Sequence, residues 1–150
     1  MSETLKPIRK NYEKIKSITK WTKIDKRKLK ETTEGGSATY YFNKGNLKKI
    51  EVIYYGETGK KVSQYYTMKK ELSFVIEKTF NYEKPIMTDT INAVEIAEIV
   101  KEESFFKNGE LIRQINNQDC GSPFAKDYLL EEQSRIINNY NKLKNRLNKK

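Results

Sequence analysis

The chain has 150 residues, of which 36% are hydrophobic and 33% are charged, and its formal net charge is +10 at pH 7. This length fits one domain, and the 10 Tyr, 6 Phe and 1 Trp are too many for a long disordered tract. The absence of histidine excludes His-based acid–base catalysis and most zinc sites, and a single cysteine excludes an internal disulfide.

The positive charge is concentrated at the two ends of the sequence. The net charge is +8 over residues 1–30, −2 over 31–120 and +4 over 121–150. A nucleic-acid-binding sheet normally carries basic groups beside its aromatic side chains. The aromatic-rich middle is slightly acidic, so we do not expect a nucleic-acid partner. Binding through the basic ends and strand aromatics remains the alternative.

The first predicted element is a helix over residues 7–19. Pro7 suits a first helical turn, and Ile8, Tyr12, Ile15 and Ile18 recur at spacings of three and four. An extended strand is expected near residues 28–33, and Gly35-Gly36 then marks a turn.

From Ser37 onward the apolar period changes to two. The segments "ATYYF", "LKKIEVIYY", "KKVSQYYTM" and "ELSFVIEKTFNY" are separated by short turns rich in Gly, Asn and Lys. Strands joined by such short turns are antiparallel neighbours. The pattern predicts a β-meander over about residues 28–116, which Asn108-Gly109 continues as a final hairpin. Residues 86–103 fit either a short helix or a strand.

The last predicted element is a helix over about residues 123–147, with Ser122 as its N-cap and Pro123 in its first turn. An apolar stripe runs along it, formed by Leu129, Ile136, Tyr140, Leu143 and Leu147. We expect the stripe to pack on the sheet, with a homodimer through this helix as the alternative. The predicted fold is therefore one α+β domain, 1–150, an antiparallel meander with both helices packed on one face.

Three segments form a weak internal repeat: "YYFNKGNL", "YYTMKKEL" and "SFFKNGEL". Each has aromatic residues, a turn and then Leu. Lys70 stands where the other two have Gly45 and Gly109. Because the spacings between the copies differ, we interpret them as three hairpins with similar turns rather than as the units of a solenoid.

The tyrosine doublets place one ring on each face of the predicted sheet, because successive strand residues point to opposite sides. If the strands on either side of each turn pair without a bulge, Thr39 lies opposite Ile50, Val52 opposite Ser63 and Tyr65 opposite Phe74. The less apolar face then carries four aromatic side chains that we predict to bind a protein, namely Tyr40, Phe42, Tyr55 and Tyr66. Half-burial by a curled sheet is the structural alternative.

Catalytic and metal-binding motifs are not found in the sequence. Cys120 lacks a neighbouring base, and Glu102-Glu103 and Glu131-Glu132 are most simply solvated. No apolar run reaches the ~18 residues of a membrane span. We therefore expect a non-enzymatic protein without cofactor or metal, which binds another protein.

The segment "EGGSATYYFNKGNLKKIEVIYYGETGKKVSQYYTMKKELSFVIEKTF", with "FFKNGELIRQI", resembles small uncharacterised exported proteins of Bacteroidetes-type bacteria. Their meander resembles the β-lactamase-inhibitor-protein-like fold. The resemblance covers about residues 31–116, and Lys70 and the 86–103 segment depart from it. It implies export to the periplasm, with cytoplasmic location as the alternative, and it implies inhibitor-like or immunity-like binding by analogy of fold.

Overall fold

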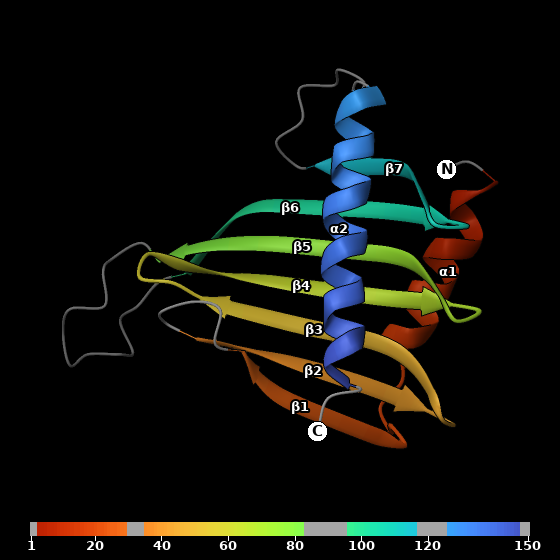
Figure 1. The fold of residues 1–150 in the computed structure, drawn as a ribbon, viewed down its shortest axis with the longest axis horizontal. Coiled ribbons are helices and arrows are strands. Elements are labelled where there is room, and N and C mark those ends of the chain that lie inside the picture. The colour runs from red at the N-terminus through yellow and green to blue at the C-terminus, as the bar shows by residue number, and fades with distance from the viewer. Residues whose placement is uncertain (1–2, 30–34, 83–95, 117–125, 148–150) are drawn as a thin grey trace.

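The structure is a computed structural model that describes residues 3–29, 35–82, 96–116 and 126–147. Its elements follow the chain in the order listed here: α1 (Leu5–Lys16), β1 (Lys23–Leu29), β2 (Gly36–Asn43), β3 (Asn46–Tyr55), β4 (Gly59–Met68), β5 (Glu71–Tyr82), β6 (Ile96–Lys107), β7 (Glu110–Asn116) and α2 (Lys126–Leu147). The strands form one antiparallel sheet in the order β1 to β7 (Figure 1). The predicted α+β meander with a helix at each end is confirmed.

Several predicted boundaries differ from the structure. The first strand occupies Lys23–Leu29 rather than 28–33. Within the ambiguous 86–103 segment, the part from Ile96 onward is strand. The predicted N-cap Ser122, Pro123 and Cys120 lie outside the described residues, as does 83–95.

Three hairpins share one turn geometry. Their central residues all have positive φ: Lys44 and Gly45, Lys69 and Lys70, Asn108 and Gly109. Two consecutive residues in this region define the type I′ turn, whose twist matches that of the flanking strands. A register shift accompanies each turn. It lies between Tyr41/Phe42, Tyr66/Thr67 and Phe105/Phe106 in the strand before the turn, and it leaves one extra residue in the strand after the turn. The sequence repeat therefore encodes one structural unit, a tight turn followed by a bulge.

These bulges change which residues share a face. Tyr40, not Thr39, lies opposite Ile50, and Tyr66, not Tyr65, lies opposite Phe74. The predicted pair of Val52 with Ser63 is confirmed, because no register shift lies between β3 and β4. A one-residue bulge exchanges the two faces of the strand beyond it, since side chains alternate with a period of two.

The two helices pack on opposite faces of the sheet, so the prediction that both lie on one face is wrong. Beneath α2 is the larger core, which includes Tyr40, Ile50, Tyr65 and Phe106. A second core lies between α1 and the other face (Figure 1). Its members are Leu5, Ile8, Tyr12, Ile15, Tyr66, Phe74, Ile76 and Phe105. The aromatic doublets make both faces apolar, and each face buries its apolar area under its own helix.

The apolar stripe of α2 packs within its own chain. Ile136, Tyr140 and Leu143 are buried against the sheet, with Leu129 and Leu147 partly buried beside them. The expected packing on the sheet is therefore confirmed. The central residues of the stripe are covered by the chain's own sheet. Among the described residues, no helix combines the length and apolar character needed to cross a membrane.

Candidate functional site

The four residues predicted to bind a protein do not share a surface. Tyr40 is fully buried beneath α2, whereas Tyr66 is buried on the opposite face beneath α1. Phe42 is half-buried and packs at the margin of the α2 core. Only Tyr55 is exposed, with 42% of its surface accessible. The predicted Tyr-rich face is therefore not formed, because the bulges assign Tyr40 and Tyr66 to different cores.

Tyr40 ties the sheet to the end of α2. Its hydroxyl donates a hydrogen bond of 2.6 Å to the carbonyl oxygen of Leu143. The guanidinium of Arg27 lies 5.9 Å from the centre of the Tyr40 ring and donates to the carbonyl oxygens of Arg146 and Leu147. These bonds satisfy terminal carbonyls that a helix leaves unpaired. Burial raises the pKa of Tyr40, so its hydroxyl remains a donor.

Tyr66 has an equivalent structural role on the other face. Its ring lies 4.8 Å from that of Tyr12 in α1, with the two planes nearly perpendicular. The Tyr66 hydroxyl donates to Oε1 of Gln64 at 2.9 Å, and Nε2 of Gln64 donates to Oε2 of Glu51 at 2.6 Å. Burial raises the pKa of Tyr66. A residue so enclosed supports packing rather than recognition.

A different surface remains uncovered. Helix α1 packs on β4, β5 and β6 near the hairpin turns that follow β4 and β6, and no described helix covers the rest of this face (Figure 1). We call the uncovered part the open face. Its side chains are Ile24, Lys26, Lys28, Thr39, Tyr41, Lys49, Glu51, Ile53, Tyr55, Lys60, Val62, Lys78 and Phe80. All of these residues are at least partly exposed, and Ile24 is 56% exposed.

Cross-strand pairing organises the open face into rows. Ile53 lies between Ser37 and Val62. Lys28 ends that row on β1, and on the other side the row continues from Lys78 of β5 to Lys101 of β6. An apolar centre is therefore framed by ammonium groups. Such a polar rim around an apolar centre is typical of a protein contact surface.

The next rows add aromatic rings to the open face. Tyr41 lies opposite Ile24, with the Trp21 ring 5.2 Å away and the Lys49 Nζ 5.1 Å from the Tyr41 ring centre. Burial lowers the pKa of Lys49. At the far end, Lys60 Nζ lies 5.4 Å from the Phe80 ring. The rings therefore support ammonium groups through cation–π contacts.

Charge on the open face is predominantly positive. Five lysines, at positions 26, 28, 49, 60 and 78, stand with one carboxylate, Glu51. The Glu51 carboxylate already accepts a hydrogen bond from Gln64. This local excess is hidden in the sequence, where acidic residues of the same strands lower the net charge of the segment. The topology brings the lysines of four strands to one side.

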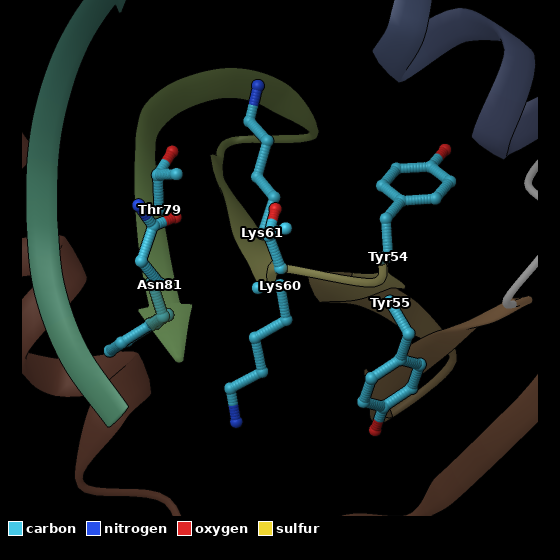
Figure 2. Close-up of a pocket in the computed structure, with 10 residues that line it drawn as sticks. Tyr54, Tyr55, Lys60, Lys61, Thr79 and Asn81 are labelled. Carbon is cyan, nitrogen blue, oxygen red and sulfur yellow. The ribbon is translucent and has the colours of Figure 1, made fainter. Parts of the chain in front are cut away.

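Figure 2 shows how the end of β3 divides its side chains between the two faces. Tyr55 and Lys60 point to one side, and Tyr54 and Lys61 point to the side on which α2 lies. A shallow hollow of about 270 Å³ lies around this end of the sheet. Tyr55 and Lys60 therefore extend the open face to the β3–β4 turn.

On the α2 face, a charged network was not expected from the sequence. Both carboxylate oxygens of Glu77 accept from Arg135, at 2.8 and 3.0 Å, although Glu77 is only 6% exposed. Arg135 also pairs with Glu132 at 2.7 Å and Glu102 at 3.5 Å. Glu102 and Glu132 are therefore paired with Arg135, and Glu103 is paired with Arg9 at 2.9 Å. These three carboxylates are not merely solvated, as the sequence had suggested. The sequence feature that could have predicted this network is Glu77, an acidic residue within the largely apolar strand "ELSFVIEKTF".

The network holds α2 to the sheet. The Arg135 guanidinium pairs with the buried carboxylate of Glu77. A buried carboxylate would be costly to leave unpaired. In this network the carboxylates of Glu77, Glu102 and Glu132 face the two cations of Arg135 and Lys61. No protein-family model, curated protein or solved structure matches the chain. The resemblance to exported proteins with an inhibitor-like meander therefore gains no support and stays a hypothesis.

Proposed function

We propose that the chain is a non-enzymatic protein-binding domain whose contact surface is the open face. The observation that carries this proposal is an uncovered sheet surface with Ile53 and Val62 at its centre, the exposed Ile24 on the edge strand β1, and five lysines around them. Solvent-accessible apolar side chains gathered on one side of a sheet are typical of interaction sites. An inhibitor or immunity-type protein, which acts by occupying another protein's surface, is the sharpest form of the proposal.

Charge complementarity defines the partner. The lysines of the open face favour a protein whose contact surface is acidic around an apolar centre. Their ammonium groups lie at the margin, where opposite charges accelerate association and select between partners. The apolar centre supplies affinity through its burial.

A polynucleotide fits this surface less well. Sequence-tolerant binding of single strands depends on aromatic rings whose faces are free for bases. The Tyr41 ring has Trp21 and the ammonium of Lys49 beside it. The most exposed apolar side chain is aliphatic, that of Ile24. A protein partner is therefore favoured over nucleic acid.

Charge reversal on the open face tests this proposal. The triple variant K28E/K60E/K78E reverses three lysines of the surface, and K44E/K69E/K107E makes the same change in charge at exposed residues in or beside the three type I′ hairpin turns. Proteins captured from native lysate by the wild-type chain are identified by mass spectrometry. We expect the open-face variant to bind the captured partner about tenfold more weakly and the control to retain its affinity.

Two results would contradict the proposal. An equal loss of binding in both triple variants would show that net charge alone determines capture. Retention of DNA or RNA that falls steeply with salt and is lost in K28E/K60E/K78E would assign the surface to nucleic acid instead. Circular dichroism of both variants establishes that the fold is retained.

A further inference from the structure

A second concave site lies on the opposite side of the sheet from the open face. It is a pocket of about 240 Å³ between α2 and strands β3, β4 and β5. Figure 2 shows two of its residues, Tyr54 and Lys61, pointing toward the α2 side. The full lining is Tyr54, Lys61, Ser63, Tyr65, Glu77, Asn139, Lys142, Leu143 and Arg146.

Two hydroxyl groups of this pocket are available to a ligand. Ser63 is 3% exposed and Tyr65 is 4% exposed, and neither hydroxyl hydrogen-bonds to another described residue. Their oxygen atoms are not among the fully enclosed unpaired atoms of the described residues, so both can be reached from the pocket. Burial raises the pKa of Tyr65, so its hydroxyl keeps its proton and can donate. The pocket thus presents two hydrogen-bond donors to whatever enters it.

The charge of the lining is positive. Lys142 and Arg146 line it in addition to Lys61, and Lys61 is already paired with the single carboxylate of the lining, Glu77. That carboxylate is compensated by Arg135, which binds both of its oxygens, and by Lys61 at 3.1 Å. Lys142 is exposed and forms no ion pair with any described residue. Cations and hydroxyl donors that converge on one pocket favour an anion.

We propose that this pocket binds a small oxyanion, the phosphate or carboxylate group of a small molecule. The hydroxyls of Ser63 and Tyr65 would donate to its oxygens from the sheet, and Lys142 would meet its charge from α2. A volume of about 240 Å³ lies below the range of pockets that enclose drug-sized ligands, so a single anionic group with a short body fits best. The inference does not depend on the proposed function, because the open face lies on the other side of the sheet.

Titration with simple salts tests the site. Inorganic phosphate, acetate and chloride are compared at equal ionic strength by thermal unfolding and isothermal titration calorimetry. A ligand that binds the folded chain raises its Tm in a concentration-dependent manner. We expect phosphate or acetate to raise the Tm more than chloride does, and the stronger of the two to identify the ligand class. Identical shifts with all three salts would overturn the proposal.

Matched variants locate the binding. K142Q removes a cation of the pocket, and K144Q removes a cation of the same helix that does not line it. K142Q should weaken binding about tenfold and K144Q should leave it unchanged. Y65F should also weaken binding, although without ligand its Tm should stay close to that of the wild type, because the Tyr65 hydroxyl forms no hydrogen bond with another described residue. Equal affinities for K142Q and K144Q, or undiminished binding by Y65F, would refute the assignment.

Discussion

Tyr65 and Tyr66 are consecutive in β4, yet their rings pack beneath different helices. The Tyr65 ring lies 5.9 Å from that of Tyr140 in α2, and the Tyr66 ring lies 4.8 Å from that of Tyr12 in α1. Strand alternation sends the two rings through opposite faces. β4 is therefore a central strand that joins the two cores, and its doublet binds both helices to one sheet.

Removing the hydroxyl of Tyr40 should loosen α2. Tyr40→Phe deletes the 2.6 Å hydrogen bond to the Leu143 carbonyl while retaining the buried ring. We expect the free energy of unfolding to fall by about 1 kcal/mol, the net value of a typical buried hydrogen bond. Urea unfolding measures the change. Tyr55→Phe, at an exposed position, should stay within about 0.5 kcal/mol of the wild type, and an equal loss in both variants would contradict the assigned role.

Neutralising Glu77 should be among the most damaging changes in the sheet. Glu77→Gln removes the buried charge that Arg135 and Lys61 compensate, and we expect a loss of about 2 kcal/mol, less than for a fully buried pair because Arg135 is 35% exposed and keeps Glu132 as a partner. Lys61→Gln, which changes a 43% exposed partner, should cost less than about 1 kcal/mol. Chemical denaturation at pH 7 compares them, and similar losses would show that burial does not govern this network.

Acid should weaken the same contact. Burial alone would raise the pKa of Glu77, but hydrogen bonds and charge from Arg135 and Lys61 outweigh it and lower that pKa. A carboxyl whose pKa is lower when folded stabilises the fold above its unfolded pKa, and the contribution is lost as pH falls through the folded pKa. Unfolding curves from pH 7 to pH 3 should show wild-type stability approaching that of Glu77→Gln. A constant difference would contradict the linkage.

Glu102 should show the opposite dependence. Burial and repulsion from Glu77 and Glu132 raise its pKa, against a hydrogen bond from Asn116. A raised folded pKa means stability that is present below the unfolded pKa and lost as pH rises through the folded value. As pH increases from 4 to 7, the stability of Glu102→Gln should therefore rise relative to that of the wild type, as measured by thermal unfolding. A relative stability that falls over this range would indicate that the ion pair with Arg135 dominates.

Lys70 should be the weak point of the hairpin repeat. It has a φ of +68°, whereas glycine holds the corresponding turn position at residues 45 and 109. A residue with a Cβ is disfavoured in this region by about 1–2 kcal/mol, part of which glycine returns as backbone entropy. Lys70→Gly should therefore stabilise the chain by about 1 kcal/mol in urea unfolding. The reverse change, Gly109→Lys, should destabilise it by a similar amount, and unchanged stability in both would exclude turn strain.

Local patterns in the sequence were enough to predict the four central strands, their turns, the final hairpin and the order of the meander, whereas the first strand was misplaced and residues 86–103 were left ambiguous. Alternation, short Gly- and Asn-containing turns and the apolar stripe of α2 act between near neighbours, so a single sequence reveals them. The bulges are different in kind. Each depends on how two strands pair beyond a turn, and one inserted residue moved Tyr40 to the opposite face from that predicted.

The candidate site depended on the bulges and on helix placement. The sequence predicted an aromatic surface from Tyr40, Phe42, Tyr55 and Tyr66, of which Tyr55 alone is exposed. The lysines of the open face and the pocket beneath α2 combine residues from distant elements, and net charge along the chain conceals both.

The sequence by itself determined an antiparallel meander with a helix at each end, because local periodicity and turn chemistry specify those elements. Only the tertiary structure decided that the helices cover opposite faces and that part of one face stays open. Those outcomes depend on strand register and on the area each helix can cover. Both are set by contacts between residues far apart in the chain.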